Sequence, residues 1–338
     1  NMKCTNDEGF YCENGGVKDA WDKRQGTVAD INFLLINWLR DYKVSAHPLL
    51  VSTHENGAPN PSYVDMGQFN AVMVYVQIDS TPYVLNAADK YAPFDMIPSE
   101  INFSSALVAD EKHSHWIKIS DTRKRYASQG IMNLNIAANG KISGFANLIF
   151  HDYARVREME NVEKGNVKSR FNIDKNIDLS VDSFHVENEE SDSLPLNINL
   201  NVSGVARNSG NYLLIPYNLY SGMSENPFTA DNRKTSVQFG VLRSFSLTGY
   251  INIDDGLVFD ALPKSISMRI MDSSILVRRI FQKNSDRTAS FLLSIYILRP
   301  TYSLDEYSDI KAFYKQLFTL LDERIVVKRA AVLIKSKE

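Results

Sequence analysis

The sequence predicts an α+β fold, in which one helix and antiparallel strands precede a mainly antiparallel β region that ends in a helix. Apolar residues recur at spacings of three and four behind Thr27, as in an amphipathic helix. Alternating polar and apolar residues surround Asn139-Gly140, a dipeptide typical of tight hairpin turns. The helical spacing returns behind Ser303, near the end of the chain. One helix followed by antiparallel strands is an α+β arrangement.

The composition is that of an ordinary globular protein. The 338 residues are 44% hydrophobic and 23% charged, which suffices for two domains with sizeable cores. The net charge is −3 and the basic residues are scattered, so we expect no nucleic-acid partner. The longest apolar run, from Phe291 to Leu298, suits a buried strand and is too short to span a membrane. The sequence starts without a charged and then apolar leader, which says little about localisation.

The first part of the chain contains the best-defined helix. Residues 1–20 hold few apolar side chains and predict a loosely ordered lead-in. Gly26 permits a tight entry into a helix over about 28–42, with Thr27 as N-cap and Asp30 as its capping-box partner. The expected buried face of this helix consists of Ile31, Leu34, Leu35, Trp38, Leu39 and Tyr42.

Strands and turns follow this helix. The segment 54–61 is dense in turn-forming residues and predicts a loop, and residues 79–82 predict a hairpin connection. Period-two patterning and β-forming residues predict four strands, at about 46–53, 69–78, 83–87 and 115–119.

The second part, from about residue 123, is rich in predicted strands. Two of them flank Asn139-Gly140 as a hairpin, and a helical segment follows over about 153–168. The acidic stretch 187–193 predicts a solvated loop; calcium binding is conceivable, but its spacing fits no recognised calcium loop. A capping box from Ser303 to Glu306 opens the last helix. Further strands are expected at about 194–205, 211–217, 237–253, 265–271, 275–282 and 289–298.

Several segments together resemble known proteins. Residues 21–122 resemble the transglutaminase-like superfamily, which has the papain type of fold. Residues 123–338 resemble the β-rich domain of unknown function that follows it in exported bacterial proteins. The resemblance implies these two domains, and the N-terminal β domain that usually precedes them is missing. The first resemblance rests on the helix after Gly26, on 48–57, on 68–76 and on 83–89 with Ile97-Pro98. The second rests on Asn226-Pro227-Phe228, Arg233, Phe239-Gly240, Leu262-Pro263 and the helix containing Tyr314.

The resemblance also implies where a catalytic triad would lie. Family members carry a cysteine nucleophile at the helix N-terminus, a histidine base on one strand and an orienting aspartate on the next. The matching positions here are Val28, Ala71 and Asn86, none of which has the required functional group. We therefore expect a catalytically inactive protein with a binding or architectural role in the cell envelope, periplasmic or at the cell surface. The alternative is a cysteine-dependent acyl transferase or peptidase with another nucleophile.

The remaining chemically active residues support no enzyme site on their own. Cys4 and Cys12 lie near the N-terminus, and the sequence leaves open whether they form a disulfide, although two unpaired thiols are the default. His113 and His115 resemble a two-histidine metal pair but lack a carboxylate at a persuasive spacing. We expect no metal, no cofactor and no catalytic residue. The expected partner is a protein, a peptide or an envelope ligand of unknown identity.

Overall fold

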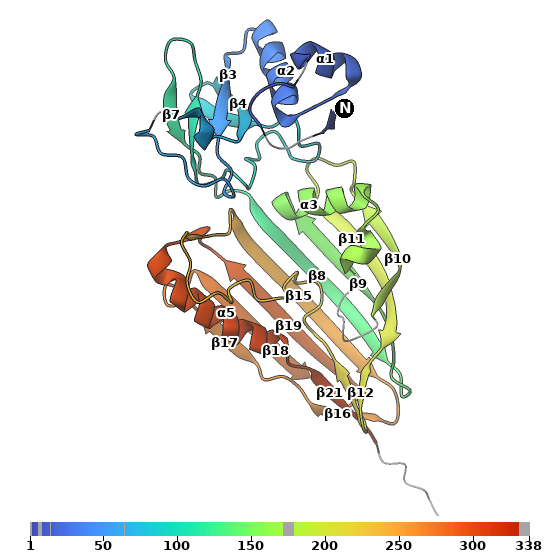
Figure 1. Ribbon diagram of the computed structural model, residues 1–338. Helices are drawn as coiled ribbons and strands as arrows, with labels where there is room; N and C mark the ends of the chain where they lie inside the picture. Colours follow the sequence, from blue (N-terminus) through green and yellow to red (C-terminus); the bar gives the residue numbers. More distant parts are fainter. Residues whose placement is uncertain (1, 6–8, 14, 64, 172–178, 331–338) are drawn as a thin grey trace, which may run out of the picture. The chain divides into compact units, whose positions relative to one another are not determined.

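A computed structural model describes residues 2–5, 9–13, 15–63, 65–171 and 179–330 (Figure 1). The chain is mixed but strand-rich and has the expected helix near its C-terminus, but a short strand that the sequence patterns did not indicate follows that helix. It forms two compact units. Unit 1 contains residues 1–124 and 238–241, and unit 2 contains residues 125–237 and 242–338. None of the described helices is both long and apolar enough to cross a membrane.

Unit 1 contains two helices and a five-stranded antiparallel sheet in the order β5-β4-β3-β6-β7. The predicted strands are present, and β6 adds a strand that the sequence patterns did not indicate. The helices are α1 (Gly16–Lys23) and α2 (Val28–Asp41), with a 3-10 turn, η1, at Met66–Gln68. The strands are β1 (Lys3–Cys4), β2 (Gln25–Gly26), β3 (Ala46–Val51), β4 (Ala71–Ile78), β5 (Thr81–Leu85), β6 (Ser105–Val108) and β7 (His115–Lys118).

The expected lead-in over residues 1–20 contains regular structure. Helix α1 begins at Gly16, and β1 pairs in parallel with β2, so that Cys4 lies opposite Gly26. The sequence patterns missed both elements. Helix α1 is short and β1 has only two residues, so that neither shows a full period of apolar residues.

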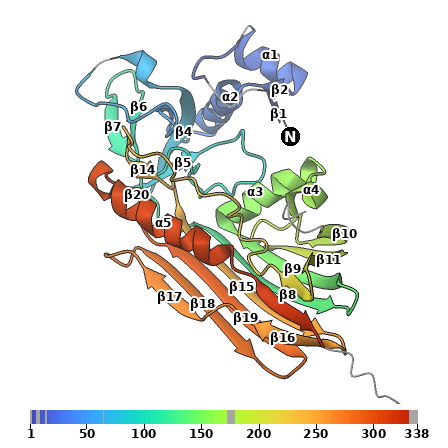
Figure 2. The same cartoon turned by 60° about the horizontal axis from the view of Figure 1, so that its bottom comes forward.

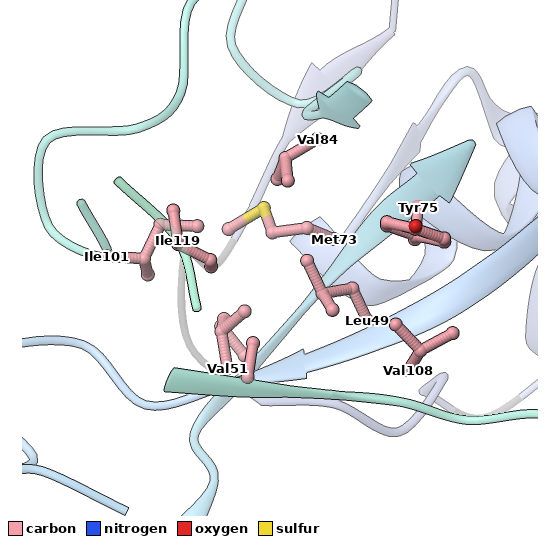
Figure 3. Packing of buried hydrophobic residues seen from close by; sticks show 10 residues of the cluster. Leu49, Val51, Met73, Tyr75, Val84, Ile101, Val108 and Ile119 are labelled. Atoms are coloured by element: carbon pink, nitrogen blue, oxygen red, sulfur yellow. The ribbon is translucent and has the colours of Figure 1, made fainter. Parts of the chain in front are cut away.

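One face of the sheet in unit 1 carries a closed apolar cluster (Figure 3). The side chains of Leu49, Met73 and Val108 point into it from β3, β4 and β6, and each is almost fully buried. Because burial of such a side chain contributes about 1.5–3 kcal/mol, this cluster stabilises the sheet strongly.

Helix α2 is rotated relative to the expected buried face. Ala29 and Ile36 belong to two apolar clusters with β4, and Asn32 lies between them with no exposed surface. This stripe faces the sheet. Of the predicted buried face, Ile31 and Leu34 are buried, and Leu35 and Leu39 pack partly buried against the second cluster, but the prediction is wrong for the two aromatic residues near the end of the helix. There Trp38 is 46% exposed and packs edge-to-face on Trp21, and Tyr42 is 84% exposed.

Unit 2 is built on an eight-stranded sheet in the order β10-β11-β9-β8-β15-β19-β18-β17. Six of its seven strand pairings are antiparallel, three in each half of the sheet. The central pair, β8 and β15, runs parallel over twelve registered residues. The strands are β8 (Arg125–Ile136), β9 (Lys141–His151), β10 (Ser180–Glu187), β11 (Leu196–Val205), β15 (Leu242–Ile253), β17 (Ile266–Arg269), β18 (Ile275–Lys283) and β19 (Thr288–Ile297).

The remaining elements of unit 2 include a four-stranded sheet in the order β12-β13-β21-β16. The hairpin predicted at Asn139-Gly140 is present, with Gly140 in the left-handed region. The predicted helical segment contains α3 and α4, and the predicted last helix is α5. The elements are α3 (Asp152–Glu163), α4 (Val167–Phe171), β12 (Arg207–Ser209), β13 (Tyr212–Ile215), β14 (Val237–Gln238), β16 (Leu257–Ala261), β20 (Thr301–Tyr302), η2 (Leu304–Glu306), α5 (Tyr307–Leu321) and β21 (Ile325–Arg329).

Helix α5 lies along one face of the large sheet (Figure 2), where a buried arginine holds its C-terminal end. Arg279, on β18, is 1% exposed and donates to the last-turn carbonyl of Leu320, to the carbonyl of Lys264 and to the hydroxyl of Tyr217. It also forms an ion pair with Glu323 at 3.0 Å. The guanidinium therefore connects the last turn of α5 to β18 through a carbonyl that also accepts from the Glu323 amide.

The acidic stretch lies at the end of β10 and in the loop that follows it. The guanidinium of Arg155, from α3, donates to the carbonyl oxygens of Asn188, Glu189 and Ser191. These oxygens are the kind of ligand that calcium uses. Here they accept hydrogen bonds from the Arg155 guanidinium instead, so its positive charge balances negative charge of the acidic loop.

Candidate functional site

The N-terminus of α2 has the expected cap. The Thr27 hydroxyl accepts from the Asp30 amide at 3.2 Å, and Asp30 Oδ2 accepts from the amide of Thr27 at 3.0 Å and from its hydroxyl at 2.9 Å. The capping box is therefore confirmed. Val28 is the first residue of the helix and is 3% exposed. The helix N-terminus thus presents an isopropyl group where the resemblance implies a thiol.

The other two positions lie on β4 and directly after β5. Ala71 is the first residue of β4, where it pairs with Val51 of β3. Asn86 directly follows β5, and its Oδ1 accepts from the Ala88 amide at 3.1 Å. Neither side chain can move a proton, because one is a methyl group and the other a neutral amide.

Asn32 joins the helix to both strands. It lies one helical turn after Val28, and its Nδ2 donates to the Val72 carbonyl at 2.9 Å and to Asn86 Oδ1 at 3.1 Å. Its Oδ1 accepts from the Ala87 amide at 2.8 Å. Residues adjacent to all three triad positions are therefore bonded or packed together, since Ala29 and Val72 also share an apolar cluster.

A segment near the N-terminus lies against the same strand. Gly9 forms a parallel bridge with Ala71, and its amide donates to the Asn70 carbonyl at 2.6 Å. Phe10 packs against the apolar cluster that contains Ala29 and Val72. The sequence patterns did not indicate Asn32 or Phe10. The available signal was an asparagine inside the apolar stripe of a helix, four residues after the position aligned with the nucleophile.

Cys12 lies beside Asp30 at the start of α2. Burial of the thiol, together with the adjacent carboxylate, raises the pKa of Cys12 to about 12. The thiol is therefore protonated at neutral pH, which disfavours its use as a nucleophile. Cys12 and Cys4 are not joined by a disulfide.

A polar pocket of about 580 Å³ borders Cys12 and Asp30. Its wall includes Asp19, which is paired with Lys23 at 2.6 Å. It is lined by Thr5, Cys12, Glu13, Gly16, Asp19, Ala20, Lys23, Gln25, Gly26 and Asp30. Among the described residues that line it, three carboxylates against one amine make the pocket acidic, and none is a histidine.

The histidines singled out from the sequence lie elsewhere in unit 1. His115 contacts the Tyr75 ring, and its Nδ1 lies 3.0 Å from the carbonyl oxygen of His113. His47 Nδ1 lies 3.0 Å from Asp110 Oδ2. Backbone amides of Lys112 and His113 lower the pKa of Asp110 by donating to it. Within the described ranges, no three His, Cys, Asp or Glu side chains form a cluster suited to a metal ion.

Comparison with protein families gives one match. Residues 211–327 match a family described as a domain of unknown function, DUF3858, for which a structure has been solved. The match runs from the segment before β13 to β21, all within the strand-rich region, except that residues 238–241 belong to unit 1.

Comparison with solved structures gives a distant likeness. A protein from Parabacteroides distasonis, provisionally described as a protease, has a TM-score of 0.48 and 12% sequence identity over 92% of this chain. The chain spans 46% of the length of that protein's chain. No curated protein matches the sequence.

Proposed function

We propose that this chain is a catalytically inactive transglutaminase-like protein with a binding or architectural role in the bacterial cell envelope. One observation supports inactivity above others. The elements that would supply cysteine, histidine and aspartate converge around Asn32, yet they carry Val28, Ala71 and Asn86. The envelope location and a protein, peptide or envelope ligand as partner rest on the family resemblance.

The loss of all three groups matters because triad residues act as a unit. Removal of the unit leaves only the contribution of binding and oxyanion stabilisation, several orders of magnitude below the intact site. Introduction of a thiol alone, as in Val28→Cys, is therefore not expected to restore turnover.

The second candidate is a cysteine-dependent acyl transferase or peptidase. The observation in its favour is Cys12, which lies beside the N-terminal turn of α2. Its raised pKa and the absence of a histidine from the pocket wall weigh against it.

The test is an assay of amine incorporation and amide hydrolysis on glutamine and peptide substrates, with and without a thiol alkylator. We expect no turnover from the unmodified protein. Cys12→Ser and Cys4→Ser serve as matched variants. Alkylator-sensitive turnover that disappears in either variant would establish the second candidate and refute the first.

A further inference from the structure

Three different groups lie along one edge of strand β4: strand β5, the Asn32 side chain and the main chain at Gly9. On one side β3 pairs with residues 71–76. On the other side β5 pairs only with residues 74–78. The Asn32 amide binds the Val72 carbonyl. Gly9 lies beside Ala71 and donates to the Asn70 carbonyl. The beginning of β4 is therefore an edge on which β5 is replaced by another extended segment.

The segment Gly9–Cys12, here called the strap, lies on this edge as a bound peptide would. Its main chain pairs with the edge at Gly9, and the ring of Phe10 enters the apolar cluster with Ala29, Leu50, Phe69 and Val72. The next side chain, Tyr11, is 70% exposed. Main-chain pairing combined with a side chain that packs in an apolar pocket is the usual mode of peptide recognition by a sheet edge.

The strap is attached by a short main-chain pairing and by two partly buried side chains. Gly9 forms the bridge to β4, Phe10 packs against the apolar cluster, and the Cys12 thiol is hydrogen-bonded to Asp30. Gly9 has a φ of 102°, a left-handed conformation that glycine adopts readily and other residues rarely adopt. The site therefore favours glycine followed by an aromatic residue, and its present occupant pairs with the edge over a single bridge.

We propose that the strap is a displaceable occupant of a peptide-binding edge, and that the site accepts an extended peptide with a glycine followed by an aromatic residue. This inference rests on the binding role proposed above and names the class of ligand. In this arrangement the strap competes with the ligand, so that the site opens when the contacts of Gly9 or Phe10 are lost.

The test measures the fluorescence anisotropy of a labelled peptide with the strap sequence, in which serine replaces the cysteine. The full chain is compared with Phe10→Ala, and Tyr63→Ala is the matched control, because that ring is 63% exposed and lies outside the strap, whereas the Tyr11 ring packs on Phe10. Phe10→Ala is expected to bind the peptide at least tenfold more tightly than the unmodified chain. Tyr63→Ala is expected to match the unmodified chain. A peptide with alanine in place of phenylalanine should bind none of them.

Gly9→Pro is the second variant, because it removes the amide donor and leaves the Phe10 side chain in place. It should also bind the peptide more tightly. Equal binding by all four proteins, or binding by none while their denaturation curves remain cooperative, would overturn the inference. Neither result bears on catalysis, and turnover in the acyl-transfer assay would refute inactivity without affecting the peptide site.

Discussion

Replacement of Asn32 with alanine is expected to lower the free energy of unfolding of unit 1 by about 1.5–5.5 kcal/mol. The side chain has no exposed surface and forms hydrogen bonds with Val72, Asn86 and Ala87, besides a longer one to Met73 Sδ at 3.9 Å. Its loss leaves the Val72 carbonyl buried without a donor, at a cost of about 1–3 kcal/mol, and removes two further bonds of about 0.5–1.5 kcal/mol each. The better helix propensity of alanine offsets about 0.5 kcal/mol of this.

Urea denaturation followed by tryptophan fluorescence measures this change, because Trp21, Trp38 and Trp116 all belong to unit 1. Asn37→Ala is the matched control, since Asn37 lies on the same helix and is exposed. The cost of Asn32→Ala combined with Asn86→Ala should be less than the sum of the single costs, because the two amides share a hydrogen bond. A loss below about 0.5 kcal/mol, equal to that of the control, would refute the role given to Asn32.

Three further outcomes are expected. Arg279→Leu should destabilise unit 2 by about 3–5 kcal/mol in urea denaturation followed by far-UV circular dichroism; a loss under 1 kcal/mol would contradict the anchoring of α5. Arg299 and Ser303 lower the pKa of Glu306 from 4.5 to about 2, so this carboxylate stabilises the fold above pH 4.5 and loses that effect as the pH falls towards 2. The difference in melting temperature between the unmodified protein and Glu306→Gln should shrink over that range, and a constant difference would exclude the linkage. Asp30→Asn should lower the pKa of Cys12 and speed its alkylation at pH 8, as measured by mass spectrometry; an unchanged rate would show that burial alone protects the thiol.

The sequence predicted correctly those elements that are stabilised by residues close together in the chain. The Thr27 and Asp30 cap joins residues three apart, and the Asn139-Gly140 turn joins adjacent strands, so their side-chain types suffice to predict them. Asn86 was expected within the strand at 83–87 and lies directly after β5 instead. The elements around the candidate site could therefore be placed from local patterns, whereas the matching of Val28, Ala71 and Asn86 to a triad rests on the resemblance.

The rest depends on contacts between residues far apart in the chain. Trp38 fits the helical period, yet it is exposed because the sheet selects a stripe rotated towards Asn32. From the sequence alone, Asn32 is a polar residue at a buried position of an apolar helix. Its role depends on the Val72 carbonyl, which accepts its hydrogen bond and lies 40 residues away in the chain. Burial of Arg279 likewise depends on acceptors at Lys264 and Leu320 that no sequence period connects.

The parallel pairing of β8 with β15 has a practical consequence for expression of the region that matches DUF3858. Residues 211–327 contain β15 and its antiparallel partner β19 but not β8. A fragment cut to those limits would keep the pairing with β19 but expose the other edge of β15 along its whole length, and would lose the side-chain bond from Asn252 to Asn133, 119 residues earlier. A long strand edge with unpaired amides and carbonyls is a template for aggregation. Such a fragment should therefore associate through β15, whereas a fragment that begins before Arg125 should remain dispersed.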